Sequence, residues 1–104
     1  MTASNPPLSP LDEAHATQLA AIFKILGDPN RVRLIVLLLD AELSVNALSE
    51  RLAMSQSAVS HQLRLLRDHQ IVRTRRAGRQ IYYTLDDDHI RAILTQALAH
   101  VAHS

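Results

Sequence analysis

The chain has 104 residues, enough for one domain with a modest core; 47% of them are hydrophobic and 20% are charged, and the net charge is +1. This is a globular composition, and the longest apolar run, Leu34–Leu39, is far shorter than the ~20 residues of a membrane-spanning helix. The absence of cysteine excludes disulfides and thiolate metal sites, and two glycines are too few for a phosphate-binding loop. No basic cluster followed by an apolar stretch opens the sequence, so we expect a cytoplasmic protein without a secretory signal.

The first two thirds of the sequence predict a tail and four helices. Residues 1–10 are rich in Pro, Ser and Asn, which favours a flexible tail before a single domain over residues 11–104. Apolar residues then recur at helical spacing, Gly27 ends the first helix, and Asp28-Pro29 supplies the N-cap and first position of the second. We expect helices over residues 11–26, 28–40 and 44–53, and a fourth that opens at Ser55.

The last third of the sequence predicts a β-hairpin and a final helix. The β-rich runs 71–75 and 80–85 bracket four residues, among which Gly78 can supply the positive φ of a turn. Residues 86–104 begin with three acidic residues, which suit the positive end of a helix, and continue with apolar residues at helical spacing. The order α-α-α-α-β-β-α, mostly helical with a small hairpin, is that of a winged helix-turn-helix domain.

Basic residues are concentrated between Ser55 and Leu85. Asp68 is the only acidic residue in that stretch, and the other acidic residues flank it on both sides. Guanidinium groups pair bidentately with phosphate and stay charged at any relevant pH, so this segregation indicates a polyanion as partner more than a merely solvated face. The arginines of the stretch are Arg64, Arg67, Arg73, Arg75, Arg76 and Arg79.

Residues 48–64 have the pattern of a helix-turn-helix, in which one helix ends in a small residue and a serine caps the next after a short turn. On the second helix Val59, Leu63 and Leu66 predict a buried face, which leaves a polar face for double-stranded DNA. Gln56 suits an adenine, the helix arginines suit phosphates, and the hairpin arginines suit the DNA backbone or minor groove. The predicted DNA contacts are Ser55, Gln56, Ser57, Ser60, His61, Arg64, Arg67, Arg75, Arg76 and Arg79.

The first and last helices indicate an oligomer. Residues 11–26 and 90–101 carry more apolar surface than a domain of this size can bury by itself. We therefore expect a homodimer in which both helices pack against their two-fold mates.

Three of the six histidines fall on the last helix, together with an aspartate, and all four side chains are donors that zinc accepts. His89 and His100 are eleven positions apart, roughly 16 Å along a helix, so one chain cannot bring both ends to one ion. Eleven steps of ~100° return to nearly the same face, so antiparallel last helices in a two-fold dimer would form two equivalent sites. The candidate metal ligands are Asp87, His89, His100 and His103.

Three segments carry a resemblance to a known family: Leu26–Ile35, Ser55–Arg67 and Ala77–Leu85. They resemble the ArsR/SmtB family of metal-responsive winged-helix repressors, and the similarity extends over residues 11–103. The resemblance implies a homodimer, joined through its first and last helices, that sits on a palindromic operator and leaves it when metal binds. It also implies that a ligand histidine passes the signal on through a hydrogen bond to a carbonyl near Gln70.

The resemblance also implies a particular class of metal site. In zinc- and cobalt-responsive members, an Asp-x-His start and a His-x-x-His end of the last helix form a tetrahedral site between subunits, and the four candidate ligands match this pattern. Other members use a cysteine on the third helix, where this chain has Ser44, so that site class is absent. Members tuned to nickel or cobalt add ligands, and the first eleven residues contain no histidine. Zn²⁺ is therefore the expected effector, with Co²⁺ or Ni²⁺ as further candidates.

Other interpretations of the sequence are an enzyme, a constitutive DNA-binding protein and a regulator with another signal. A zinc hydrolase needs an open coordination position and a general base, and four protein ligands leave no open position. An architectural DNA-binding protein would carry its histidines incidentally, and a related regulator could answer nickel, cobalt or a non-metal signal. We interpret His15 and His69 as ordinary surface or interface residues.

Overall fold

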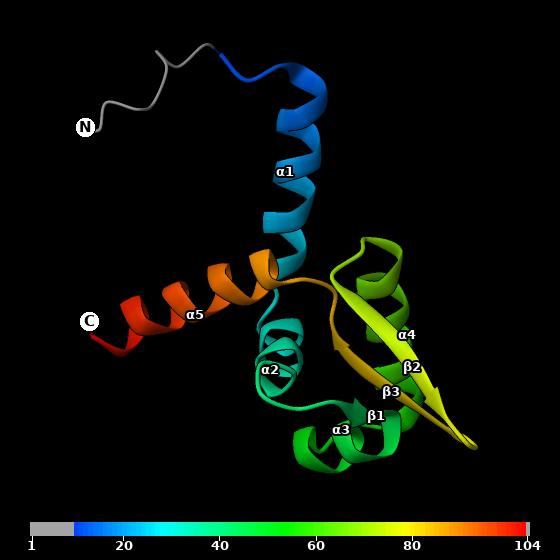
Figure 1. Ribbon diagram of the computed structural model, residues 1–104. Helices are drawn as coiled ribbons and strands as arrows, with labels where there is room; N and C mark the ends of the chain where they lie inside the picture. Colours follow the sequence, from blue (N-terminus) through cyan, green and yellow to red (C-terminus); the bar gives the residue numbers. More distant parts are fainter. Residues whose placement is uncertain (1–9, 104) are drawn as a thin grey trace.

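The computed structural model describes residues 10–103 and confirms the winged helix-turn-helix fold (Figure 1). Apart from Pro10, the predicted tail lies outside the described residues. No helix within residues 10–103 is long and apolar enough to cross a membrane. The elements are α1 (Glu13–Leu26), α2 (Pro29–Leu37), β1 (Leu43–Ser44), α3 (Val45–Leu52), α4 (Gln56–Asp68), β2 (Val72–Ala77), β3 (Gln80–Leu85) and α5 (Asp88–Ala102).

Every helix begins after a side chain that accepts a hydrogen bond from a backbone N–H three residues further on. The predicted caps at Asp28 and Ser55 are confirmed. The last helix begins two residues later than predicted because Asp87 takes the cap position. The second helix ends at Leu37, before its predicted end. The five caps are Asp12, Asp28, Ser44, Ser55 and Asp87.

The sheet has three strands, one more than the sequence predicts. β2 and β3 form the predicted antiparallel hairpin, with Ala77 opposite Gln80 and Gly78 at a φ of +63° in the turn. β1 adds to the other edge of β3, with Leu43 opposite Tyr83, which gives the order β1-β3-β2. A two-residue strand is too short to show an alternating pattern in the sequence, and only its distant partner defines it.

The core lies mainly among α2, α3, α4 and the sheet and also includes Ile25 of α1 and Ile90 and Leu94 of α5. It determines which face of α4 points outward. The predicted inner face of α4 is confirmed, because Val59, Leu63 and Leu66 are each 0% exposed. The largest fully buried side chains are Leu34, Ile35, Leu38, Leu48, Leu63, Leu66, Ile71, Leu85, Val59 and Val72.

The helices α1 and α5 project from this core in different directions (Figure 1). The radius of gyration is 16.0 Å, whereas about 13 Å is expected for a compact domain of this length. Between α1, α2 and α5 lies an apolar groove of about 330 Å³, to which Phe23, Ile93 and Leu98 contribute. Such exposed apolar helices favour the predicted dimer. The large exposed hydrophobic residues on α1 and α5, here called the apolar face, are Leu19, Phe23, Ile93, Leu98 and Val101.

Candidate nucleic-acid interface and metal-binding helix

The turn between α3 and α4 is fixed by local hydrogen bonds. Ala53 ends α3 in the left-handed conformation, at a φ of +53°, and the Ser49 hydroxyl donates to the carbonyl of Met54. The Ser55 hydroxyl then accepts from the Ala58 N–H at 3.0 Å and starts α4. These contacts leave the direction of α4 little freedom relative to α3, as a helix that enters the major groove requires.

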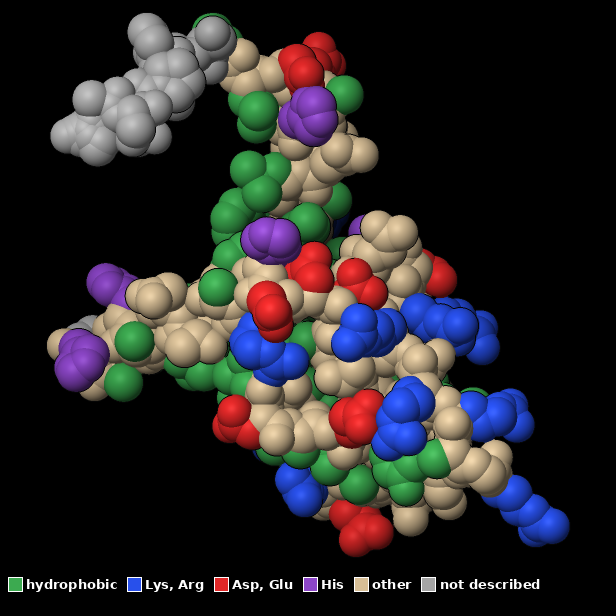
Figure 2. All heavy atoms as spheres, in the orientation of Figure 1, with side chains coloured by type: hydrophobic (Ala, Val, Ile, Leu, Met, Phe, Trp, Pro, Cys, Tyr) green, Lys and Arg blue, Asp and Glu red, His purple; other side chains and the backbone are tan. Residues whose placement is uncertain are grey.

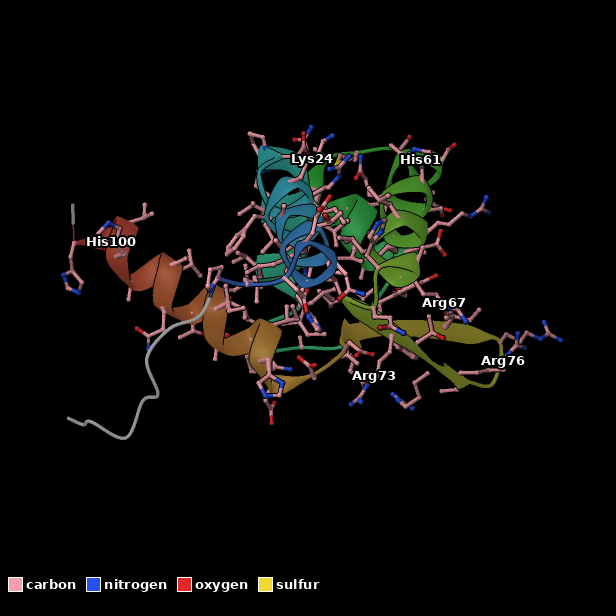
Figure 3. The ribbon with its side chains drawn as sticks, turned by 90° about the horizontal axis from the view of Figure 1, so that it is seen from above. Lys24, His61, Arg67, Arg73, Arg76 and His100 are labelled. Atoms are coloured by element: carbon pink, nitrogen blue, oxygen red, sulfur yellow. The ribbon has the colours of Figure 1, made fainter. Side chains whose placement is uncertain are left out.

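The polar face of α4 is exposed as predicted. All seven candidate DNA contacts from Ser55 to Arg67 are solvent-exposed. In Figure 3, His61 and Arg67 project from α4 and Arg76 from the wing, all far from His100. Near the middle of α4, the Gln62 Oε1 accepts from the Arg31 Nε of α2 at 2.9 Å, which braces α4 against α2. The interface residues themselves therefore stay available to a partner while the helix beneath them is held.

The wing, formed by β2, β3 and their turn, carries the remaining basic residues. Figure 2 shows Lys and Arg side chains gathered over α4 and the wing, apart from the histidines at the end of α5. Arg76 and Arg79 are exposed next to the turn at Gly78. An α4 with an outward polar face beside an arginine-rich hairpin defines a winged-helix DNA-binding protein.

One predicted wing contact, Arg75, is engaged within the protein. It lies opposite Tyr82 in the ladder rather than at the tip, and its guanidinium stacks 5.2 Å from the centre of that ring. Its Nε and Nη2 donate to both carboxylate oxygens of Glu42 at 2.9–3.2 Å. The hydrogen bonds lower the pKa of Glu42 and raise that of Arg75. Sequence reasoning missed Glu42 because it is 33 positions away from Arg75.

We expect Glu42→Gln to strengthen binding to DNA of any sequence. The change removes an acidic group beside the wing and frees Arg75 to contact a phosphate. The affinity for DNA should therefore rise several-fold, and the slope of log affinity against log salt concentration should steepen by about one. Fluorescence anisotropy at several salt concentrations measures both. Glu13→Gln on α1 removes the same charge far from the wing and should change little. Weaker DNA binding by Glu42→Gln would show that Glu42 instead orders the wing for DNA.

The start of α5 holds the first pair of candidate metal ligands. Asp87 Oδ1 accepts from the Ile90 N–H at 3.0 Å, a bond that lowers the pKa of the carboxyl, and Oδ2 lies 3.6 Å from His89 Nδ1. Two ligands of a tetrahedral zinc ion are about 3.4 Å apart when both bonds are ~2.1 Å long. The His89 side chain is 94% exposed and that of Asp87 is 49% exposed. The pair therefore fits one zinc ion with small adjustments and is open to solvent.

The second pair, His100 and His103, lies at the opposite end of the same helix, where His103 is the C-cap; Figure 3 shows His100 at that end. The two ends of α5 are too far apart for one ion, and within residues 10–103 no three His, Cys, Asp or Glu side chains cluster in a metal-binding arrangement. A single chain thus brings together the first pair but not all four ligands. His15 pairs with Asp12 at 2.9 Å and His69 Nδ1 contacts the Leu65 carbonyl at 3.0 Å, so both have local structural partners.

Comparison with known proteins identifies the family. Residues 28–74 match the family model for bacterial regulatory proteins of the arsR family. The chain is 42% identical over 99 residues to the HTH-type transcriptional regulator NmtR of Mycobacterium tuberculosis, covering 95% of this chain and 82% of that protein. It is 41% identical over 99 residues to a transcriptional repressor SmtB homolog of Synechocystis, covering 95% and 74%.

Solved structures agree with these relatives. The solution structure of apo-NmtR is 40% identical and superposes with a TM-score of 0.79 over 100% of this chain and 87% of that one. A homodimeric winged helix-turn-helix domain, Mb0332 from Mycobacterium bovis, is 25% identical with a TM-score of 0.78 over 95% and 90%. The chain belongs to the ArsR/SmtB family of DNA-binding transcriptional regulators. It is not an enzyme, so the zinc hydrolase interpretation is excluded.

Proposed function

We propose that the protein is a metal-responsive repressor that binds operator DNA as a homodimer and leaves it when zinc binds between the subunits. The observation that carries the metal assignment is the Asp87–His89 pair, whose 3.6 Å separation suits two ligands of one ion. His100 and His103 of the partner subunit would complete each of two sites. The relative from Synechocystis is named a repressor, and the NmtR structure is described as an apo form, which supports a ligand-controlled repressor.

The donor set supports zinc as effector. One carboxylate and three imidazoles satisfy a four-coordinate tetrahedral site, and bound zinc would supply a fixed link between the two α5 helices. Co²⁺ accepts the same set, whereas Ni²⁺ more often takes additional ligands. DNA would be held by the exposed residues of α4, from Ser55 to Arg67, and by the wing arginines Arg75, Arg76 and Arg79.

Contacts at the start of α5 provide a path from the metal ligands to α4. The Asp86 N–H donates to the Ile71 carbonyl at 2.9 Å, and the Ile71 N–H donates to the Leu66 carbonyl of α4 at 2.9 Å. Arg91 donates to the Leu39 carbonyl just after α2. A change in the angle at which the two α5 helices cross would therefore tilt both α4 helices. The separation of the α4 helices would then no longer match operator half-sites that lie about 34–36 Å apart.

Operator binding with and without zinc tests this function. A specific duplex is first selected from random DNA by the metal-free protein and its affinity is measured by fluorescence anisotropy. Zinc should weaken specific binding by about 5- to 150-fold, the usual range of allosteric coupling, while Mg²⁺ should not. Specific binding that ignores zinc, cobalt and nickel alike would contradict the metal-responsive function and favour a constitutive DNA-binding protein or a regulator with another signal.

Two substitutions on α4 should separate phosphate contacts from base contacts. We expect Arg64→Ala to weaken binding to all duplexes and to reduce the salt slope by about one. Gln56→Ala should weaken the selected operator by about 1–3 kcal/mol and leave other DNA nearly unaffected. Anisotropy on operator and scrambled duplexes measures both effects. Equal losses of specific and non-specific binding in both variants would show that this division of α4 is wrong.

A further inference from the structure

One side-chain hydrogen bond joins the first turns of α3 and α4. The Gln56 Nε2, on the first residue of α4, donates to Asn46 Oδ1 at 2.7 Å. Asn46 is the second residue of α3, and both side chains are exposed. Sequence reasoning assigns base contact to Gln56 and no role to Asn46.

Both partners stand on backbone that is already fixed. The Ser44 hydroxyl accepts from the Ala47 N–H at 3.2 Å and starts α3, and Ser55 does the same for α4. The contact between Ser49 and Met54 closes the turn between them. Only the side-chain torsions of Asn46 and Gln56 remain to be ordered, so forming their hydrogen bond carries no further cost of ordering the backbone.

The bond orients the Gln56 amide relative to α3. In the structure Asn46 Oδ1 accepts from Gln56 Nε2, so the Gln56 –NH₂ lies on the α3 side. Its Oε1 and its second N–H are then left for a partner in the major groove. Adenine presents a matching N6–H₂ donor and N7 acceptor, whereas guanine presents two acceptors, one of which would face Oε1.

We propose that Asn46 is a specificity-determining residue that positions the Gln56 amide to read an adenine in each operator half-site. The inference rests on the proposed DNA-binding function and deepens it. Asn46 acts through Gln56 and does not itself touch the base. Losing it leaves Gln56 present but free to turn its amide, so selectivity for adenine should fall while binding to phosphates is retained.

The test uses the selected operator with each adenine replaced in turn by 7-deazaadenine, which lacks the N7 acceptor. For the unaltered protein, one symmetric pair of positions should show a loss of about fivefold or more. Gln56→Ala should abolish that penalty, and Asn46→Ala should reduce it together with a several-fold loss of operator affinity. In the double variant the Asn46 substitution should cost nothing further, because its effect passes through Gln56.

Two further variants separate positioning from general effects. Asn46→Asp keeps an oxygen acceptor, so the 7-deazaadenine penalty should persist although the added charge weakens binding to all DNA. Asn30→Ala removes an exposed asparagine from α2 and should leave both affinity and base preference unchanged. All variants should have the melting temperature of the unaltered protein. They should also bind a scrambled duplex as the unaltered protein does, except that Asn46→Asp should bind it more weakly because of its added negative charge.

The outcomes are distinct. Additive losses in the double variant, or an undiminished penalty in Asn46→Ala, would overturn the positioning role while leaving the regulator function intact. Failure to select any specific duplex with the metal-free protein would overturn the proposed function, and the inference with it.

Discussion

Replacing His100 with glutamine should abolish release of the operator by zinc and leave metal-free operator binding intact. The substitution removes one of four proposed ligands, and position 100 lies at the far end of α5 from the residues that face DNA (Figure 3). Zinc should weaken the unaltered complex by about 5- to 150-fold, and this factor should fall to nearly one in the variant. Anisotropy titrations of the operator complex with zinc measure both factors.

His15→Gln on α1 is the matched control, because it removes an exposed histidine outside the proposed site. It should respond to zinc as the unaltered protein does. A His100→Gln protein that is still released by low-micromolar zinc would remove this residue from the ligand set.

Mixing two defective variants tests whether the site is shared between subunits. In a heterodimer of His89→Gln and His100→Gln, one intersubunit site carries both defects and the other carries neither. With random subunit exchange, about a quarter of all sites should recover high-affinity zinc or cobalt binding. A site made within one chain would recover none, so absence of complementation would contradict the intersubunit arrangement.

Leu98→Asp should convert the dimer to a monomer and reduce operator affinity by at least about 100-fold. Leu98 belongs to the apolar groove beside Phe23 and Ile93, and it is already 40% exposed in the single chain, so the folded monomer can tolerate a charge there. Burying that carboxylate between two subunits would be strongly unfavourable. A monomer binds one half-site and loses the effective concentration that linkage provides.

Sedimentation equilibrium at micromolar concentration measures the dimer, and anisotropy measures operator affinity. Gln96→Asp places the same charge on α5 but outside the groove, and it should remain dimeric. A dimeric Leu98→Asp protein would exclude the groove from the subunit interface.

The fold could be predicted largely from local signals in the sequence. Aspartate and serine caps, helical spacing of apolar residues and Gly78 determine where most elements begin and turn. The buried face of α4 follows from the spacing of Val59, Leu63 and Leu66. The strand β1 could not be predicted, because two residues carry no periodicity and its existence depends on β3.

For the candidate site, the sequence indicates which residues share a helix face, but it does not indicate the contacts those residues make. The polar face of α4 and the donor pairs of α5 follow from spacing along a helix. The engagement of Arg75 by Glu42, and of Gln56 by Asn46, arises from packing between separate elements and has no local signature. Within residues 10–103 of a single chain, no three candidate ligands come together. The proposed metal site therefore needs a second chain, whose position the spacing of His89 and His100 does not give.

If the apolar face of α1 and α5 forms the dimer interface, repression depends on the concentration of the protein as well as on the metal. Only dimers present two paired DNA-reading helices, and at low concentration the dimer population falls with the square of the free-chain concentration. Operator occupancy should therefore drop more steeply than in proportion as the protein is diluted by growth without new synthesis. A promoter under its control would show a dosage threshold even at constant metal supply: where free chains predominate, halving the gene copy number lowers the dimer about fourfold, so an operator that was about half occupied falls to about one-fifth occupancy.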